Sequence, residues 1–471
     1  MRTNSSASRY PDLQTAFSRL NRAVVVLDLE TTGGNLGQDR ITEIAFLRFD
    51  EDGAHAFESL VQPEQSISPF ITQLTGIDDK MLANAPRFAE LAPQLLPLLQ
   101  GAILVAHNSK FDYNFLRYEF ARAGIHFAAP ALCSVQLSRK LFPQFHKHSL
   151  ESIIERHQIA VQSRHRAMAD VCALADFLQL ACQQHGADAF EAQARALMSP
   201  PMPPAFIAES LQQQLYALPD SAGVLLWQDK RGDALFLSNH DKTFREAVQL
   251  LHQKSAWQQH IASIQFFASA GALHGIKIQA KLAQQHGLHA EKMPSADGKS
   301  YCAVRFVANE NGELNAKIIT LPNGVLSQEN FGLFVNKKAA KQALLKWAKQ
   351  YALCPKMLDI LPYTLPKDAP CPAAQVGTCG GNCQSADGRQ RQNEAIKRFA
   401  HALPIYGWHK ISAMEIVESD AITGLQHRSI CENGLLRIDD ETYYFDAELP
   451  KILKEKFKQK GNNVHILRNT F

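Results

Sequence analysis

The stretch VVVLDLETTGG (24–34) places two acidic residues inside an apolar segment that is typical of a buried β-strand. Because side chains alternate across a strand, Asp28 and Glu30 point from the same face and lie close together. Two like charges beside apolar neighbours repel each other unless a cation or a basic side chain compensates them. A salt-bridged pair is the simpler explanation, and other segments of the chain favour a cation.

Two further segments place polar side chains at the ends of apolar elements. LVAHNSKFDYNFL (104–116) puts His107 and Asp112 just after an apolar strand, with Asp112 on the first turn of a helix. SRHRAMADVCALADFL (163–178) puts His165 at the entry of a predicted helix and Asp170 five residues later, near the start of that helix. Taken singly, each acid can serve a helix N-terminus, and each histidine can be a cap or a surface residue.

Taken together, these side chains and the pair on the opening strand have the composition of a metal-assisted phosphoryl-transfer site. Two magnesium ions about 4 Å apart can hold an attacking water and a leaving oxygen in line across a phosphodiester, and such hard cations require oxygen ligands. The ions would also hold the two like charges of the opening strand together. A histidine that titrates near neutral pH can take the proton from the attacking water.

The segments LDLETTG (27–33), HNSKFD (107–112) and HRAMAD (165–170) resemble the three motifs of the DnaQ-like 3′–5′ exonucleases. This group includes the proofreading subunit of bacterial replicases. The resemblance spans about residues 21–185 and implies a ribonuclease H-like fold. It implies that two Mg²⁺ or Mn²⁺ ions are bound and that His165 is the general base.

The resemblance also implies roles for individual side chains. The implied metal ligands, which are catalytic together with the histidine, are Asp28, Glu30, Asp112 and Asp170. The implied contacts to the substrate are Thr31, Phe111 and His107. For Phe111, a role in the hydrophobic core is an equal alternative.

The bulk composition is that of a multidomain globular protein. The chain has 471 residues, 46% of them hydrophobic, which is enough apolar mass for two or three cores. Residues 1–20 lack the pattern of a signal peptide, and no later run reaches transmembrane length without proline or charge. We therefore expect a cytoplasmic protein with no membrane partner.

The segment RALMSPPMPPAF (195–206) contains four prolines and predicts a stiff linker. Before it, we expect three strands near 23–29, 41–49 and 55–62, then a helix near 86–99 and a strand near 102–106. Helices near 110–123, 149–157 and 166–184 follow. This order predicts an α/β domain with a mixed sheet flanked by helices. The predicted divisions are an N-terminal extension (1–20), an exonuclease domain (21–185), a Pro-rich linker (186–204) and two regions, 205–300 and 301–471.

The segment LPDSAGVLLWQDKRGDALFLSNHDKTFREAV (218–248) resembles the start of a GIY-YIG nuclease domain of the UvrC and Cho type. We therefore expect a small α+β domain over 205–300. The family's tyrosines, arginine and metal-binding glutamate are replaced at the matching positions, which are Leu225, Phe236, Ser238, Ala247 and Gln279. Without these groups the predicted domain lacks its hydrolytic chemistry. The alternative is a rearranged active nuclease in which Arg245 substitutes for the arginine.

Four of the nine cysteines lie within thirty residues, in CPKMLDILPYTLPKDAPCPAAQVGTCGGNC (354–383). They are Cys354, Cys371, Cys379 and Cys383. Four thiolates can hold a [4Fe-4S] cluster or Zn²⁺, and the spacing lacks the C-x2-C pairs of common zinc sites. The last three cysteines resemble a segment of UvrC and Cho, which implies the iron–sulfur cluster within the predicted C-terminal region 301–471. Reduced, unliganded thiols are the alternative.

Charge is distributed unevenly along the chain. Residues 21–185 carry 14 basic and 18 acidic side chains, whereas residues 205–471 carry 31 basic and 25 acidic side chains. The basic second half is therefore the better candidate for contacts to a phosphate backbone. Its last predicted helix is rich in lysine, although such a run is usually a solvated helix face. These lysines are Lys451, Lys454, Lys456, Lys458 and Lys460.

The combined pattern predicts a 3′–5′ exonuclease that acts on DNA 3′ ends in repair or proofreading, with replication or repair proteins as further partners. Two other functions fit the same residues. The catalytic set also suits an exoribonuclease that trims RNA 3′ ends. The basic second half also suits a DNA-binding repair or replication adaptor in which the exonuclease is accessory.

Overall fold

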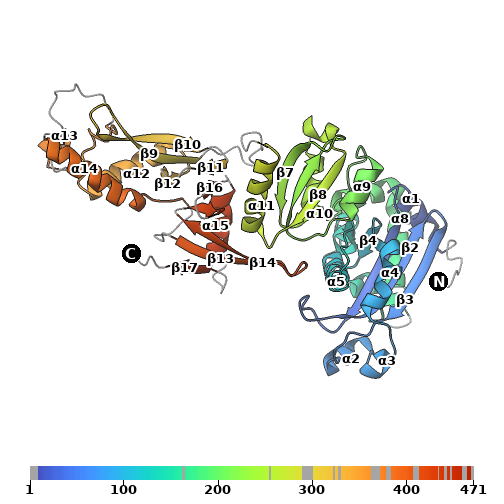
Figure 1. The fold of residues 1–471 in the computed structure, drawn as a ribbon. Helices are drawn as coiled ribbons and strands as arrows, with labels where there is room; N and C mark the ends of the chain where they lie inside the picture. The colour runs from blue at the N-terminus through green and yellow to red at the C-terminus, as the bar shows by residue number, and fades with distance from the viewer. Residues whose placement is uncertain are drawn as a thin grey trace. The chain divides into compact units, whose positions relative to one another are not determined.

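The computed structural model describes most of the chain, which is drawn from its N-terminus to its C-terminus in Figure 1. The described residues are 9–161, 165–253, 256–288, 301–321, 324–326, 330–361, 372–377, 383, 385–406, 413–432, 434–439, 443–445, 448–458 and 464–467. The chain divides into two compact units. The first holds the described residues up to Asp233, with His240–Ala268 and Ala421–Gly424, and the second holds the other described residues.

A five-stranded mixed sheet forms the centre of the first unit, with strand order β3–β2–β1–β4–β5. The bounds are β1 Val24–Thr31, β2 Ile41–Asp50, β3 Gly53–Leu60, β4 Ile103–Ala106 and β5 Ala131–Cys133. β2 pairs antiparallel with β1 and with β3, whereas β4 pairs parallel with β1 and with β5. This arrangement confirms the predicted α/β class and is that of a ribonuclease H-like fold.

The helices of the first unit are α1 Pro11–Ser18, α2 Pro69–Thr75, α3 Asp79–Leu82, α4 Phe88–Leu99, α5 Ser109–Arg122, α6 Ser134–Leu141, α7 Leu150–His157, α8 Ala167–Leu197, α9 Glu209–Tyr216 and α10 Thr243–His252. α1 and α8 pack on one face of the five-stranded sheet and α4 and α5 on the other, whereas α2 and α3 lie away from it (Figure 1). Among all helices that the structure describes, none combines the length and the apolar character that crossing a bilayer requires.

The central strand β1 is buried on both faces because its side chains alternate between two hydrophobic clusters. Val24 and Val26 pack into the cluster that includes residues of α1 and α8. Val25 and Leu27 pack into the cluster that includes residues of α4 and α5. Asp28 continues the alternation on the same face as Val24 and Val26, so its carboxylate lies on the side covered by α8.

The N-terminal segment predicted as an extension (1–20) contributes to the core where the structure describes it. Leu13, Phe17 and Leu20 are buried in the same cluster as β1. The Phe17 ring meets the rings of Phe49 and Phe190 edge-on, with centroids 5.2 and 6.0 Å away. Residues 11–20 therefore belong to the exonuclease fold, because an apolar face of α1 covers the sheet.

The segment predicted as a Pro-rich linker (186–204) is helical over its first half. α8 passes through a kink at Gly186, where φ is 79°, and ends only at Leu197. Phe190 and Ala194 are buried in the core cluster that also holds α1. Because glycine tolerates a positive φ, the helix can turn and continue to bury apolar side chains, so the prolines mark only the end of this segment.

The two compact units divide within the region 205–300 rather than at its ends. In the first unit, β6 (Gly223–Gln228) pairs antiparallel with β8 (Ser263–Ala268). β7 (Ala234–His240) and α11 (Ala272–Gln285) lie largely in the second unit. The predicted hairpin around DKRG (229–232) and the helix after it are present as β6, β7 and α10.

The second unit contains two further sheets, with strand orders β10–β9–β12 and β11–β16–β15–β14–β13–β17. The first has β9 Tyr301–Ala308, β10 Leu314–Leu321 and β12 Asn330–Phe334. The second has β11 Gly324–Leu326, β13 Ala413–Ser419, β14 Gln426–Glu432, β15 Leu435–Arg437, β16 Tyr443–Phe445 and β17 Val464–Leu467. The predicted hairpin around NENG is formed by β9 and β10.

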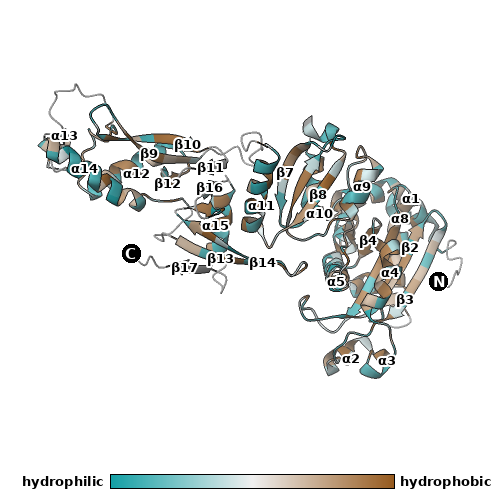
Figure 2. Cartoon of the chain, viewed as in Figure 1, coloured by the Kyte–Doolittle hydropathy of each residue, from teal (hydrophilic) through white to brown (hydrophobic). Residues whose placement is uncertain are grey.

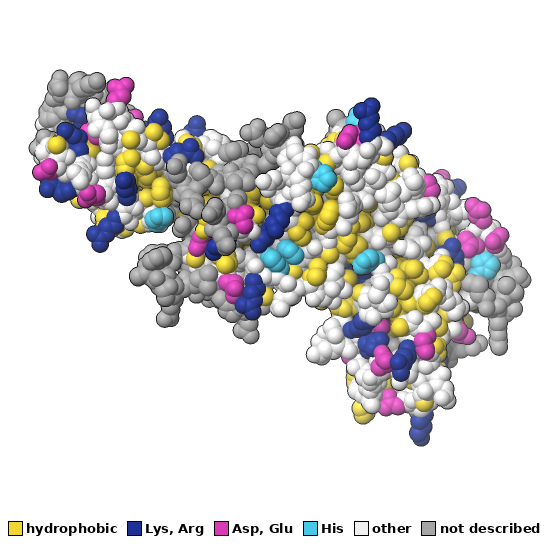
Figure 3. Space-filling view, in the orientation of Figure 1, with side chains coloured by type: hydrophobic (Ala, Val, Ile, Leu, Met, Phe, Trp, Pro, Cys, Tyr) yellow, Lys and Arg dark blue, Asp and Glu magenta, His cyan; other side chains and the backbone are white. Residues whose placement is uncertain are grey.

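The other helices of the second unit are α12 Lys337–Gln350, α13 Pro372–Gln375, α14 Ala386–Phe399 and α15 Leu449–Lys458. Figure 2 shows α14 as mostly hydrophilic, which is consistent with a helix that buries only a narrow stripe. On the face drawn in Figure 3, basic and acidic side chains are mixed over the part that carries α12 and α14.

The burial of α1 gives a first prediction. Phe17→Ala should lower the free energy of unfolding of the first unit by about 3–5 kcal/mol, because it leaves a cavity against two aromatic rings. Calorimetry or urea denaturation of the full chain measures this loss. Phe70→Ala on α2 is the matched control, since Phe70 is 71% exposed and its removal should change stability little. Equal effects of the two substitutions would show that α1 is not part of the core.

Candidate active site

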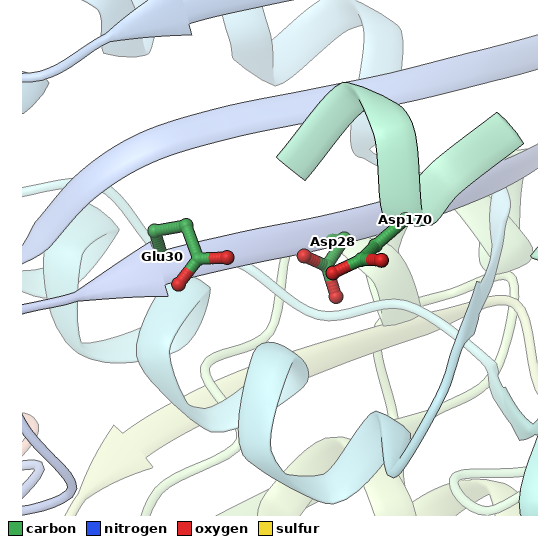
Figure 4. Close-up of side chains that lie close together, drawn as sticks. All are labelled: Asp28, Glu30 and Asp170. Atoms are coloured by element: carbon green, nitrogen blue, oxygen red, sulfur yellow. The ribbon is translucent and has the colours of Figure 1, made fainter. Parts of the chain in front are cut away.

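Three carboxylates from two elements meet at the end of β1. Asp28 and Glu30 project from β1, and Asp170 projects from the first turn of α8. One ligand oxygen of each lies within 4.8 Å of the others. Figure 4 shows the three side chains directed into the same space. The sequence predicted four carboxylates here, and the structure brings three of them within reach of one cation.

Asp112 lies beside this group rather than within it. It is on the first turn of α5 and only 3% exposed. Its carboxylate accepts hydrogen bonds from its own backbone N–H and from that of Leu29 on β1. It is also close enough to Asp28 to raise the pKa of that carboxyl. Asp112 and Asp28 are therefore close enough to act together as ligands of a second cation.

Burial and mutual repulsion shift the pKa values of Asp28, Glu30 and Asp112 upward. The pKa of Asp28 lies well above its ordinary value, first because of burial and then because of Asp112 and Glu30. Burial, Asp170 and Glu43 raise the pKa of Glu30 to about 7. Burial is also the main cause that raises the pKa of Asp112 to about 8. Ionised, the group holds more negative charge than its surroundings compensate, which is the condition for binding a divalent cation.

The alternative of a salt-bridged pair on the opening strand is not what the structure shows. Among the described residues, no basic side chain forms an ion pair with Asp28 or Glu30. Arg166 lowers the pKa of Glu30 slightly, but its guanidinium is bound to Glu43 with an N–O distance of 2.7 Å. The donor set of closely spaced carboxylate oxygens fits Mg²⁺ or Mn²⁺.

Glu43 is a functional residue that the sequence analysis missed. It lies on β2 directly opposite Glu30 and is 5% exposed. Its carboxylate binds Arg166 and accepts the backbone N–H of Ala167 at 2.9 Å, which is the first residue of α8. Glu43 thereby fixes the N-terminus of the helix that carries Asp170. The available signal was a lone acid in the apolar strand ITEIAFLRF (41–49).

His165 is tied to the carboxylate group through its backbone. Its N–H donates to Oδ2 of Asp170 at 3.2 Å, and its φ of 58° is in the left-handed region. Its side chain is exposed, as a base that exchanges protons with solvent requires. Its role as the general base stays a prediction.

The side chains predicted to contact substrate are placed near the ends of β1 and β4. The Thr31 hydroxyl donates to the carbonyl of Gly33 at 2.7 Å. Nδ1 of His107 and the hydroxyl of Ser134 share a hydrogen bond of 2.9 Å. The half-buried ring of Phe111 packs on Phe115 with centroids 4.7 Å apart, which agrees with the core role left open above. Contacts of these three residues to substrate stay predictions.

The matching positions of the GIY-YIG resemblance are occupied by packed side chains. Leu225 on β6 and Ala247 on α10 are fully buried. The amide of Gln279 on α11 donates to the carbonyl of Leu237 at 3.2 Å. Within the described part of the chain, three or more acids, histidines or cysteines lie close enough to share one ion only at the end of β1. None of the GIY-YIG positions belongs to that group.

Two of the four predicted cysteine ligands lie in one small hydrophobic cluster. Cys354 is buried and Cys383 is half-buried against it, with Met357 and two alanines. The backbone N–H and carbonyl of Cys354 both bond to the amide of Gln392, at 2.8 and 3.1 Å. Cys371 and Cys379 lie outside the described residues.

The lysine-rich helix is present as α15. Lys451, Lys454 and Lys458 are exposed, and Lys456 binds the buried carboxylate of Glu418 at 3.0 Å. Lys460 lies outside the described residues. One of the described lysines therefore has a structural role, and a contact of the others to DNA stays a prediction.

Comparisons with known proteins locate two families in the chain. Residues 25–178 match the family described as Exonuclease. Residues 301–402 match the family described as UvrC/Cho excinuclease, middle domain. An exonuclease domain and a UvrC/Cho middle domain are therefore found, which confirms the exonuclease resemblance and the UvrC/Cho resemblance of the C-terminal region.

Two curated relatives align over about a third of the chain. The chain is 38% identical to the 3′-5′ exonuclease DinG of Bacillus subtilis over 149 residues, which are 31% of this chain and 16% of that protein. It is 36% identical to the DNA polymerase III PolC-type of Caldanaerobacter subterraneus subsp. tengcongensis over 153 residues, 32% of this chain and 11% of that protein. The chain thus spans less than a fifth of these relatives.

Two solved structures align over a similar share of the chain. Exonuclease X in complex with 5′ overhanging duplex DNA is 24% identical, with a TM-score of 0.30, and the alignment covers 36% of this chain and 99% of that one. An apo structure of Exonuclease I is 20% identical with a TM-score of 0.31, covering 36% of this chain and 44% of that one.

The raised pKa values give a prediction on pH and metal. Without metal, the folded state holds protons that the unfolded chain releases near pH 4.5 (Glu30) and 3.8 (Asp112), so stability should fall as pH rises through about 7 (Glu30) to about 8 (Asp112). Mg²⁺ competes with these protons. Its stabilising effect, measured as the rise in Tm over an EDTA sample, should therefore be larger above pH 8 than below pH 6.

Two variants test the origin of this effect. Glu30→Gln should reduce the Mg²⁺-dependent rise in Tm, because it removes one ligand. Asp52→Asn in the exposed turn between β2 and β3 is the matched control and should leave the rise unchanged. A rise that is independent of pH, or equal in both variants, would contradict the assignment of the site.

Proposed function

We propose that this protein is a metal-dependent 3′–5′ exonuclease that releases nucleoside 5′-monophosphates from DNA 3′ ends. The observation that carries the proposal is the group of Asp28, Glu30 and Asp170 within 4.8 Å, at the end of the central strand of a segment that matches the exonuclease family. Similarity to the 3′-5′ exonuclease DinG supports the 3′–5′ direction, and similarity to the DNA polymerase III PolC-type supports DNA as the substrate.

In this mechanism the chain's own residues divide the work of holding cations and moving a proton. Asp28, Glu30 and Asp170 would hold one divalent ion, and Asp112 with Asp28 would hold the second. When bound, the ions neutralise charge that develops on the phosphodiester. His165 takes the proton from the attacking water, and its backbone bond to Asp170 keeps it beside the carboxylates. Glu43 and Arg166 position α8, and thereby Asp170.

The second half is proposed to bind DNA or partner proteins without hydrolysing DNA. The buried Leu225 and Ala247 and the neutral Gln279 support an inactive GIY-YIG-like region, because none can polarise water or hold a divalent ion. The match of residues 301–402 to the UvrC/Cho middle domain supports a role in DNA repair. Replication or repair proteins are the partners that this proposal implies.

Substitution of the site tests the exonuclease proposal. Asp28→Ala should abolish release of nucleoside monophosphates from a 5′-labelled strand with Mg²⁺ or Mn²⁺. His165→Ala should lower the rate by about 10²–10⁴-fold, the usual contribution of a general base. Asp52→Ala and His126→Ala, both at exposed positions of the first unit, are the matched controls and should digest DNA like the parent protein.

The same assay separates the competing functions. Preference for a matched RNA strand would replace DNA by RNA as the substrate. Undiminished digestion by Asp28→Ala would contradict the proposed site. Nicking of closed circular DNA by that variant would show that the GIY-YIG-like region is active.

We further propose that Cys354, Cys371, Cys379 and Cys383 hold a [4Fe-4S] cluster. The placement of Cys354 and Cys383 in one cluster supports a shared site, and four thiolates suit this group. Protein purified without oxygen should be brown and contain iron, and Cys383→Ser should lose both. The isolated Cys182→Ser is the matched control. Colourless protein with stoichiometric Zn²⁺ would identify a zinc site instead, and protein without either metal would refute a metal site.

A further inference from the structure

A buried carboxylate joins the exonuclease fold to the region that follows it. Asp220 precedes β6, and its side chain is fully buried. It accepts hydrogen bonds from the Tyr113 hydroxyl at 3.2 Å and from Arg117 on α5 at 3.4 Å. It also accepts the backbone N–H of Arg245 on α10 at 3.2 Å. All of these residues belong to the first compact unit, so α5 and the first turn of α10 meet at this carboxylate.

Basic side chains gather around this junction. They are Lys110, Arg117, Lys242 and Arg245. The pKa of Lys242 is lowered by partial burial and then by repulsion from Arg245, Arg117 and Lys110, and the attraction of Asp220 does not offset this. Three cations thus lie close enough to repel the exposed Lys242 ammonium and one carboxylate attracts it, which is the balance of charge expected where an anion binds.

The acids next to the junction in sequence do not remove this excess. Glu246 accepts the backbone N–H groups of Asp241 and Lys242, both at 3.2 Å, and lies 3.4 Å from the His240 ring. Asp220 forms an ion pair with Arg117, with an N–O distance of 3.4 Å. Asp241 is exposed and adjacent to Lys242, so it screens part of the charge.

The junction also contains more hydrogen-bond donors than acceptors. Nε of Arg117 and Nε of Arg245 are buried and have no hydrogen-bond partner within the described structure. Arg117 as a whole is 8% exposed. The other end of Arg245 donates to the Ser199 hydroxyl at 3.2 Å. Buried donors without acceptors are rare, and these two leave the guanidinium groups at the junction only partly compensated by Asp220.

The junction and the candidate active site share helix α5. Lys110 and Asp112 are both on the first turn of this helix. Arg117 follows Asp112 by five residues, about 7.5 Å along the helix axis, and lies on the face that also carries Lys110 rather than on the face of Asp112. A strand whose 3′ end reaches the carboxylates would therefore pass the N-terminal turn of α5 before one of its phosphates meets the junction.

We propose that Lys110, Lys242 and Arg245 form a binding site for backbone phosphates of the substrate strand, a few nucleotides from the bond that is cleaved. The site is composite, since α5 comes from the exonuclease fold and α10 from the region after the prolines. The inference rests on the proposed exonuclease function for the identity of the strand. The anion chemistry itself rests on the junction alone.

The test measures binding without cleavage. In the full chain with Asp28→Ala, the affinity for a 5′-labelled single-stranded oligonucleotide is measured by fluorescence anisotropy from about 50 to 200 mM salt. Adding Lys242→Ala should lower the affinity roughly tenfold at about 50 mM salt and reduce the slope of log K against log salt by about 0.7, the value for one lost phosphate contact. Adding Arg245→Ala should reduce the slope by about the same amount again.

Matched variants separate this site from a general loss of charge. Lys230→Ala with Arg231→Ala removes two exposed basic side chains from the turn after β6 in the same unit, and should leave the slope unchanged. Lys242→Arg should keep the parent slope. An unchanged slope in Lys242→Ala, or an equal loss in the Lys230 and Arg231 control, would overturn the inference and leave Arg117 and Asp220 as a purely structural contact.

Failure of this inference and failure of the proposed function give different results. If the parent protein digests DNA but Lys242→Ala binds with the parent slope, the phosphate site is refuted and the exonuclease stands. If the parent protein digests neither DNA nor RNA while the slope falls as expected, the junction binds nucleic acid and the exonuclease proposal fails.

Discussion

The repulsion among carboxylates at the end of β1 is the constraint on which the rest of the first unit depends. Asp28 lies in a strand whose preceding side chains are buried on both faces, so its charge cannot be fully hydrated. Burial and neighbouring acids raise the pKa values of Asp28, Glu30 and Asp112 together. A fold that only needed stability would place leucine or valine here. The arrangement makes physical sense when a divalent cation supplies the missing positive charge.

The surrounding elements hold the acids in place without neutralising them. Asp112 and Asp170 each lie on the first turn of a helix, where the positive end of the helix dipole stabilises a carboxylate. Glu43 engages Arg166, so the nearest guanidinium binds an acid on β2 instead of closing the metal site. If Arg166 were free to pair with Glu30, the opening strand would carry the salt bridge that its sequence alone allowed. Because Arg166 is paired with Glu43, it does not neutralise the carboxylates at the end of β1, and the site stays anionic.

The sequence predicted what depends on local periodicity and failed where tertiary packing decides. Strand alternation placed Asp28 and Glu30 on one face, and helix starts placed Asp112 and Asp170 at element ends. The distance of Asp112 from the other three depends on how α5 packs on the sheet, which no local pattern contains. The prolines suggested a linker over 186–204, but the apolar Phe190 and Ala194 continue α8 beyond Gly186.

Two other features, the burial of α1 and the role of Glu43, do have a signal in the sequence. Leu13, Ala16, Phe17 and Leu20 recur at the spacing of an amphipathic helix, which predicts burial of α1 against a neighbour. Glu43 was a single acid in an apolar strand, and its partner Arg166 lies far away in the sequence. Pairings at such separation are fixed by the sheet register and by the start of α8, so they become visible only in the fold.

The placement of Asp220 changes how the two halves of the chain should be understood. Similarity divides the chain into a segment at 25–178 and another at 301–402, with the region between them matched to neither. Physically, part of that intermediate region completes the first unit, because Asp220 is buried against α5. Removing one partner of a buried ion pair usually costs about 3–5 kcal/mol, so separating the region from the exonuclease fold would leave Arg117 with an uncompensated charge. The intermediate region therefore contributes β6 and α10 to the same compact unit as the carboxylates at the end of β1, and these elements cannot be separated from the exonuclease fold without exposing a buried ion pair.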